Sequence, residues 1–207
     1  MYESIFEDLR SVEFPIEKNE TFKVSYFGNY YPKRYPESQS DIDTLRVIDL
    51  KNGMRIGVDH FKSKFTSYID STLLRLFEMI AMPSHSAGNA DEAGGLRQLI
   101  KSLGATDLSH CLYRHTEVPK SSTASTRPTA EQHRDSMKPR YENQIQGKDI
   151  LLIDDVITKG SSMRAARYWL RQAKVRSVYH LAMTHTFSGQ SQRVLRTRVP
   201  TDTDILF

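Results

Sequence analysis

Residues 150–163 read ILLIDDVITKGSSM and combine an apolar run, two adjacent acids and a turn rich in hydroxyl groups. The apolar run at residues 150–153 predicts a strand buried on both faces, as in a parallel α/β sheet. Ligands of such sheets bind beyond the carboxyl ends of the strands, so we expect Asp154 and Asp155 to face a crevice. Carboxylates there can accept hydrogen bonds from hydroxyl groups or contact a hydrated Mg²⁺.

The turn after the acids has the composition of a phosphate-binding loop. Thr158, Gly160 and the pair Ser161 and Ser162 lead into a helical pattern. Main-chain N–H groups, hydroxyl groups and a helix N-terminus therefore converge on one anion, which predicts a site for a phosphorylated sugar. A Walker A loop is excluded, because Lys159 precedes the glycine instead of following it. The remaining alternative is an ordinary polar turn after a buried strand, which α/β proteins commonly contain.

The stretch ILLIDDVITKGSS resembles the phosphoribosyl pyrophosphate (PRPP) motif of type I phosphoribosyltransferases: four apolar residues, two acids, two apolar residues and a T-x-G-x-[ST] loop. The resemblance implies a Rossmann-like α/β fold in which helices flank a central parallel sheet and an N-terminal hood covers the base. It also implies that Asp154 and Asp155 contact the ribose of PRPP and that residues 158–162 hold its 5′-phosphate. Mg²⁺ would arrive with PRPP rather than on protein ligands of its own, and the family implies a homodimer.

Two positions depart from the family pattern. Lys159 stands where the family generally carries a small residue, and it can reach the phosphate, a partner or solvent; we favour the last two. Thr158 stands where hypoxanthine–guanine enzymes carry an Asp that faces the base, which argues against 6-oxopurine salvage. The sequence DDVIT is closer to orotate enzymes and to ComF-like proteins, and the chain also resembles phosphoribosyltransferase-like proteins of bacterial antiviral defence systems. The acceptor base stays open.

Composition indicates one globular unit. The chain has 207 residues, of which 38% are hydrophobic, and a net charge of +4 that suits phosphates but also permits nucleic acid. Cys111 is the single cysteine, so an internal disulfide is excluded and a reducing compartment is favoured. No apolar run approaches the roughly 20 residues of a membrane span, and the first residues do not form a signal peptide. We expect a cytoplasmic protein without membrane contact and without a structural zinc site.

Residues 1–58 are expected to form the hood and residues 59–207 the sheet domain. A short helix is expected at residues 2–10 and a strand at 22–27. Residues 45–50 and 54–58 flank Asn52-Gly53, a dipeptide typical of a tight β-hairpin turn, so we predict a hairpin there. Tyrosines of the hood can stack on a base or simply pack the hood: Tyr26, Tyr30 and Tyr31.

A helix over residues 60–74, capped by Asp59, precedes a strand expected at residues 76–82. The loop after that strand matches the pyrophosphate-binding loop of the family in its position. Its candidate residues are Ser84, His85, Ser86 and Gly88. Many relatives carry a Lys or Arg here, and this chain offers only His85 as a substitute. An ordinary Ser- and Gly-rich loop is the alternative.

A further helix is expected at residues 91–103, ended by Gly104, and a strand at 108–114. The polar tract at 115–147, with a helical patch at 129–137, is either a lid or an insertion. The family carries a catalytic loop at this position, which closes over the transition state. Four cations can then meet the pyrophosphate: Arg114, Lys120, Arg127 and Arg134. Among these four we favour Arg114 and Arg127 as catalytic residues, and a solvated basic loop is the alternative.

After the PRPP-like loop, a helix is expected to carry a stripe of cations: Arg164, Arg167, Arg171 and Lys174. This stripe is either a solvated face or a surface for nucleic acid or an acidic protein. A strand follows at 178–184, and a last apolar segment at 203–207 suggests an edge strand or a docking segment. We favour an enzyme that transfers a phosphoribosyl group to or from a nitrogenous base. The alternative is a protein that senses PRPP or a nucleotide without turnover and engages a partner.

Overall fold

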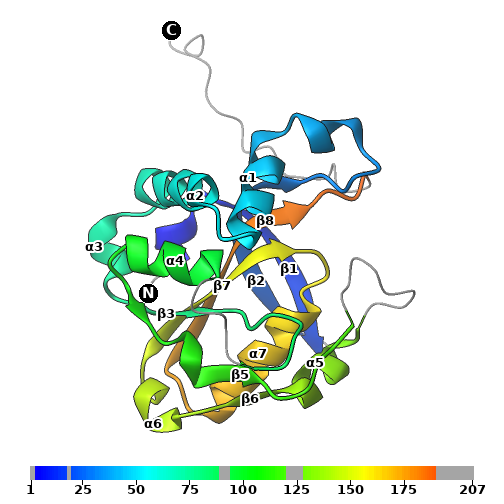
Figure 1. The fold of residues 1–207 in the computed structure, drawn as a ribbon. Helices are drawn as coiled ribbons and strands as arrows, with labels where there is room; N and C mark the ends of the chain where they lie inside the picture. Colours follow the sequence, from blue (N-terminus) through cyan, green and yellow to red (C-terminus); the bar gives the residue numbers. More distant parts are fainter. Residues whose placement is uncertain (1–2, 18–19, 89–93, 120–127, 190–207) are drawn as a thin grey trace, which may run out of the picture.

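The computed structural model describes residues 3–17, 20–88, 94–119 and 128–189, and Figure 1 traces the chain through them. The strands are β1 (Arg10–Glu17), β2 (Glu20–Tyr30), β3 (Glu78–Ala81), β4 (Thr106–Asp107), β5 (Leu112–Arg114), β6 (Met137–Pro139), β7 (Asp149–Ile157) and β8 (Ser177–Thr186). The α-helices are α1 (Ile42–Lys51), α2 (Arg55–Tyr68), α3 (Ser71–Leu74), α4 (Gly95–Ser102), α5 (Ala130–Ser136), α6 (Glu142–Ile145) and α7 (Ser161–Gln172). Short 3₁₀ turns are η1 (Glu3–Phe6), η2 (Pro36–Gln39) and η3 (Ser109–Cys111).

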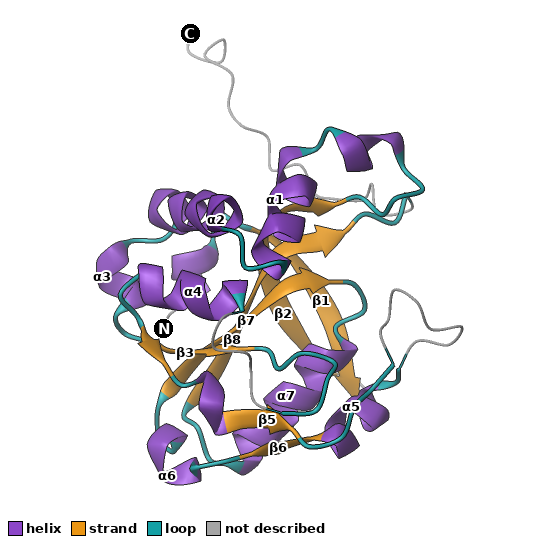
Figure 2. Cartoon of the chain, in the orientation of Figure 1, coloured by secondary structure: helices purple, strands orange, loops and turns teal. Residues whose placement is uncertain are grey.

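A mostly parallel sheet lies at the centre of the molecule. Within the described residues it has six strands in the order β1-β2-β8-β7-β3-β4, and β1 is the antiparallel member. Strands β5 and β6 form a separate antiparallel pair. Figure 2 shows α1, α2 and α4 on one side of the sheet and α7 with α5 on the other. The expected α/β class, with helices flanking a central parallel sheet, is confirmed.

Strand β7 explains why both faces of the sheet need cover. Its residues 150–153 are fully buried, and successive side chains point to opposite faces. Leu151 and Ile153 join the cluster under α1, α2 and α4, whereas Ile150 and Leu152 join the cluster under α7. An uninterrupted apolar run is what a strand between two helical layers requires.

The hairpin predicted around Asn52-Gly53 is wrong, because both flanking segments are helical. Helix α1 begins at the cap of Asp41, whose side chain accepts from the Thr44 N–H at 2.8 Å, and it ends at Lys51. Gly53 has φ +68°, so the positive φ that suggested a hairpin instead ends a helix. On each side of the turn the buried residues follow helical spacing: Thr44, Val47 and Leu50 in α1, and Val58, Phe61 and Phe65 in α2.

Other expected elements differ from the structure in their bounds or their type. Helix α2 begins at Arg55 with Met54 at its N-cap, so Asp59 is not its cap; the predicted helix at 60–74 is also divided, because α3 starts anew after Asp70. Of the strand expected at 108–114, only the last part forms: β5 follows the turn η3. Near the N-terminus, η1 replaces the predicted helix and gives way to β1. The segment at 203–207 lies outside the described residues.

The N-terminal segment is continuous with the main sheet. Strand β2 pairs in parallel with β8, with Ser25 opposite Leu181 and Tyr30 opposite Thr186. Tyr26 is buried in this region, and burial raises the pKa of its hydroxyl group despite the nearby Arg10. The division at residue 58 and the role of the tyrosines at a base stay predictions. Among the described residues, no helix has both the length and the apolar character needed to cross a membrane.

Candidate functional site

The two acids of the opening motif lie at the carboxyl edge of the sheet. Strand β3 ends at Ala81, opposite Ile153, whereas β7 continues through Asp154 and Asp155 to Ile157. The acids therefore extend beyond the end of their neighbour on one side, where a crevice forms in open α/β sheets. Both residues are partly exposed.

Main-chain hydrogen bonds fix the orientation of both carboxylates. The Asp155 N–H donates to Oδ1 of Asp154 at 2.8 Å, and the Val156 N–H donates to Oδ1 of Asp155 at 2.6 Å. The remaining oxygen lone pairs can accept from hydroxyl groups, because a carboxylate has about four acceptor positions. This arrangement suits a diol such as the 2- and 3-hydroxyls of a ribose.

Lys51 belongs to this site, although no motif in the sequence points to it. Its Nζ lies 3.3 Å from Oδ1 of Asp155, because α1 ends directly beside β7. Burial opposes its charge, but Asp155 and Asp154 together outweigh burial and raise the pKa of Lys51. The helical pattern of residues 42–51 would have placed Lys51 in the last turn of a helix, whereas the hairpin interpretation placed it in an exposed turn.

Asp154 carries an unusual charge environment. Part of the residue surface is accessible, yet the side chain is densely surrounded by protein. Burial, and then the like charge of Asp155, raise the pKa of Asp154, and Lys51 and Arg114 only partly oppose them. One lysine can neutralise only one of two adjacent carboxylates, so the pair can still attract a further cation or accept from hydroxyl donors.

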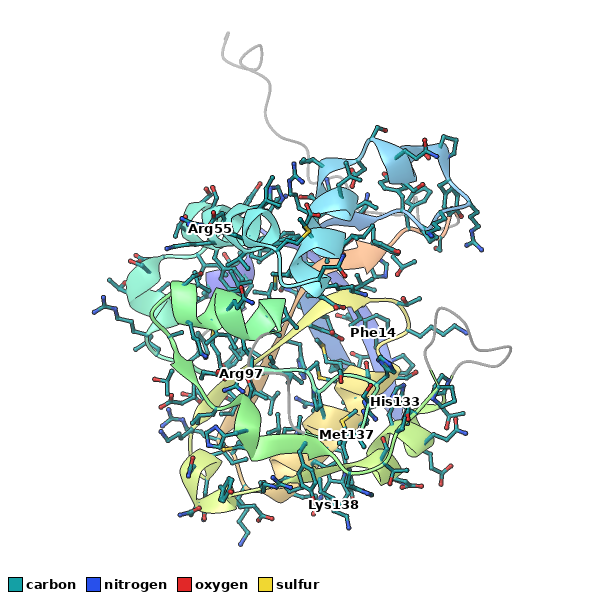
Figure 3. All side chains as sticks on the ribbon, in the orientation of Figure 1. Phe14, Arg55, Arg97, His133, Met137 and Lys138 are labelled. Atoms are coloured by element: carbon teal, nitrogen blue, oxygen red, sulfur yellow. The ribbon has the colours of Figure 1, made fainter. Side chains whose placement is uncertain are left out.

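The turn after β7 presents a helix N-terminus. Gly160 is the N-cap of α7 with φ +69°, and a β-carbon there would lie 2.8 Å from the Phe14 ring of β1. Figure 3 shows Phe14 beside the yellow segment that leads into α7. The first three amides of α7 have no acceptor within their own helix, and no other described residue accepts from them. They are therefore available to an anion.

The other residues of the turn are accessible. Ser161 and Ser162 are partly exposed, and Thr158 and Lys159 are exposed. The Thr158 hydroxyl lies 2.7 Å from the Thr186 hydroxyl of β8, which ties the turn to the neighbouring strand. The structure thus brings Asp154, Asp155 and residues 158–162 to one edge of the sheet, in sequence order and within one short connection.

The loop after β3 is anchored by its main chain. Gly88 and Arg114 exchange two backbone hydrogen bonds of 2.7 and 3.2 Å, and the Val118 N–H donates to the His85 carbonyl at 3.0 Å. The Ser86 hydroxyl lies 3.3 Å from Nε2 of His85. Ser84, Ser86 and Gly88 are exposed and His85 is partly exposed, so their side chains stay accessible around a fixed backbone.

Arg114 lies beneath this loop and not at its mouth. Its side chain is fully buried, its Nε donates to the Ser84 carbonyl at 2.6 Å, and Nη1 donates to the Ser136 hydroxyl. Burial lowers the pKa of Arg114 to about 10, and the negative charge of Asp154 opposes this shift. Arg114 thus joins the loop to α5 and acts electrostatically on Asp154.

Those of the remaining predicted cations that the structure describes have contacts away from the acids. Arg127 and Lys120 lie outside the described residues. Arg134 stacks over the Tyr168 ring at 5.3 Å, and Nη1 of Arg164 donates to the Pro15 carbonyl at 3.0 Å. Arg167 and Arg171 lie farther along α7, and the fourth member of the stripe, Lys174, follows the end of the helix.

Comparisons with known proteins give matches at the level of structure. No protein-family model matches the chain, and no curated protein matches it in sequence. A hypoxanthine phosphoribosyltransferase from Staphylococcus aureus is similar over 69% of this chain and 68% of its own, with 14% identity and a TM-score of 0.36. An adenine phosphoribosyltransferase from Thermoanaerobacter pseudethanolicus is similar over 90% of this chain and 100% of its own, with 14% identity and a TM-score of 0.41.

A phosphoribosylpyrophosphate synthetase from Mycobacterium smegmatis is also similar, over 86% of this chain and 73% of its own, with 13% identity and a TM-score of 0.34.

Proposed function

We propose that the chain binds PRPP at the edge formed by β7 and α7 and transfers its phosphoribosyl group to or from a nitrogenous base. One observation carries the proposal: an oriented carboxylate pair and a helix N-terminus with unpaired amides, among the described residues, share one edge of the sheet. Hydroxyl groups donate to the first, and a phosphate accepts from the second. A ribose 5-phosphate group carries both functions.

Magnesium fits this proposal only as part of the ligand. Asp154 and Asp155 provide the oxygen atoms that Mg²⁺ prefers, but Lys51 already offsets one of the two charges. No group of three potential ligands from His, Cys, Asp and Glu occurs among the described residues. PRPP itself would therefore supply most of the oxygen ligands of the metal, which would offset the charge of the pyrophosphate.

Transfer requires the bond between the ribose C1 and pyrophosphate to break while a ring nitrogen of the base attacks C1. The protein contributes positioning and charge stabilisation in such a reaction. The accessible side chains of the loop, Ser84, His85 and Ser86, are proposed to bind the leaving pyrophosphate. Arg127 is proposed to meet the same group from the tract after β5, and Arg114 to hold the loop in place.

The test is release of pyrophosphate from PRPP, Mg²⁺ and a panel of purine and pyrimidine bases. We expect release with one base class and loss of at least a hundredfold in Asp154→Asn. A matched control is Asp59→Asn on α2, where the carboxylate makes only an exposed contact with Arg55. Binding of PRPP without release for any base contradicts the transfer reaction.

A second candidate function, sensing of PRPP or a nucleotide without turnover, is favoured by the engagement of Arg114. The Arg114 guanidinium is buried and already bonded to Ser84 and Ser136. In this alternative, the stripe of Arg164, Arg167, Arg171 and Lys174 engages nucleic acid or a protein, as in a bacterial defence system. Salt-dependent retention of DNA or RNA that is lost in Arg167→Ala with Arg171→Ala supports it; absence of retention at low salt contradicts it.

A further inference from the structure

Strands β2 and β8 separate at the edge of the sheet opposite the acid pair. Their pairing begins at Ser25 and Leu181, although β2 starts at Glu20 and β8 starts at Ser177. Over this stretch β2 stays paired with β1, and β8 stays paired with β7. The two strands diverge and leave a cavity of about 510 Å³ between their amino-terminal ends and the last turns of α7. This volume is within the range of small-molecule sites.

The cavity wall is basic and contains no acid among the described residues. Its charged members are Lys23, Arg167, Arg171 and Arg176. Arg176 is paired with Asp149, but neither Arg167 nor Arg171 forms an ion pair with any described residue. Burial and the like charge of Arg171 lower the pKa of Arg167, and Glu20 only partly opposes them. Glu20 acts on Arg167 but does not line the cavity, so the two guanidinium groups on its wall favour an anion between them.

His180 contributes an unpaired polar atom to the same wall. The side chain is buried, with a relative exposure of 6%, and Nε2 has no hydrogen-bond partner among the described residues. A hydrogen bond with the Lys23 main chain favours the protonated ring, as a carbonyl acceptor does. Because Nε2 has no partner among the described residues, we assign this bond, and with it the ring proton, to Nδ1. Nε2 then presents a lone pair. Such an acceptor is unfavourable when it stays unpaired, and a hydroxyl or amino group of a ligand would satisfy it.

Aromatic side chains complete the wall. Phe22 lies 4.9 Å from the His180 ring, centroid to centroid, and Tyr179 and Phe6 border the cavity from the other face of the sheet. Flat apolar groups next to guanidinium groups suit a molecule with a ring at one end and a phosphate at the other. A bare anion would leave both the aromatic surface and the Nε2 acceptor without a partner.

We propose that this cavity binds a nucleoside monophosphate, with the phosphate on Arg167 and Arg171 and a hydroxyl or amino group on Nε2 of His180. The site is independent of the proposed PRPP site, because it lies at the amino ends of β2 and β8 rather than at the carboxyl end of β7. Helix α7 reaches both places: its first amides face the acid pair, and its later turns carry the two arginines.

Isothermal titration with AMP tests the proposal on the full chain. We expect one AMP per chain in Asp155→Asn, a variant that alters only the other site. The affinity should fall at least tenfold in Arg167→Gln with Arg171→Gln. Lys174→Gln is the matched control, because this exposed cation follows the same helix but does not line the cavity. The Lys174→Gln protein should bind AMP with the affinity of the unmodified protein.

A second variant, His180→Phe, removes the acceptor while keeping a ring. We expect it to bind AMP more weakly, whereas inorganic phosphate should compete for the site as it does in the unmodified protein. If this variant does not fold, as judged by circular dichroism, the AMP affinity of the double arginine variant alone tests the proposal. Three results overturn the proposal: no AMP binding, binding that Asp155→Asn abolishes, or equal losses in the arginine and Lys174 variants. Inorganic phosphate that binds as tightly as AMP overturns it too, and so does retention of an oligonucleotide by the arginines without AMP binding.

Discussion

Nζ of Lys51 lies 3.3 Å from Oδ1 of Asp155, so the last residue of α1 is joined to the acid pair of β7. The contact places a cation from the N-terminal segment inside the candidate site. It also explains how segments that lie far apart in the sequence form one electrostatic unit.

Replacement of Lys51 should weaken PRPP binding more than it weakens the fold. In Lys51→Met the acid pair loses its cation, and an anionic ligand meets two carboxylates without compensation. We expect affinity for PRPP to fall roughly tenfold, whereas the free energy of unfolding falls by less than about 1 kcal/mol, because the contact is partly exposed. Titration calorimetry and urea unfolding measure the two effects. Lys62→Met on the exposed face of α2 is the control, and equal PRPP affinity in both variants contradicts the role of Lys51.

Gly160 is expected to be intolerant of a side chain. Its φ of +69° opposes alanine, and so does the Phe14 ring, which would lie 2.8 Å from the new β-carbon. Gly160→Ala should lower the free energy of unfolding by about 2–4 kcal/mol. Gly147→Ala isolates the effect of a positive φ, because Gly147 has φ +72° with open space around it, and it should cost about 1 kcal/mol. Equal losses in the two variants, measured by chemical unfolding, would show that the Phe14 contact is unimportant.

Arg114 is expected to stabilise the fold as well as the site. Arg114→Met leaves the Ser84 carbonyl and the Ser136 hydroxyl without their donor in a buried place. We expect a loss of about 2–4 kcal/mol in the free energy of unfolding. Arg134→Met, which removes an exposed guanidinium from the Tyr168 ring, should cost less than about 1 kcal/mol. An Arg114→Met protein of normal stability that has lost pyrophosphate release would instead indicate direct contact with the ligand.

Stability should fall on mild acidification because of His133. This buried side chain, labelled in Figure 3, has no hydrogen-bond partner for Nδ1 among the described residues. Burial and then the charge of Arg114 lower its pKa from 6.5 to about 4. The unfolded chain therefore takes up a proton between these two pH values while the folded chain does not, so stability is full above pH 6.5 and decreases toward pH 4.

The size of this effect is about 2–3 kcal/mol between roughly pH 7 and pH 4. His180, whose pKa burial lowers to about 3, acts in the same direction, so the comparison has to be made against a variant. Urea unfolding of His133→Gln should show a shallower pH dependence than the unmodified protein. His115→Gln, at an exposed position, should keep the full dependence. A His133→Gln curve parallel to that of the unmodified protein contradicts the assignment.

The extent to which the sequence predicts the structure follows from how local each signal is. The strand at residues 150–153 and the turn at Gly160 are specified by consecutive residues, and both are confirmed. The Asn52-Gly53 signal is local but ambiguous, since a positive φ serves a hairpin and a helix end equally well. Only the helical spacing of the apolar residues on both sides distinguishes the two.

Contacts between segments that are distant in sequence could not be predicted from local sequence patterns. Lys51 meets Asp155 only because α1 packs beside β7, and Arg114 becomes buried only because α5 folds over the loop after β3. The gap beside His180 arises where two strands, distant in sequence, fail to pair along their full length. Nothing in the residues around His180 signals that divergence.

The most direct test of the central claim is a crystal structure of the protein with PRPP and Mg²⁺. We predict that the 5′-phosphate accepts from the main-chain N–H groups of Ser161 and Ser162 and that the ribose hydroxyls donate to Asp154 and Asp155. A PRPP molecule bound elsewhere, with the first turn of α7 and both carboxylates free of ligand, would contradict the account.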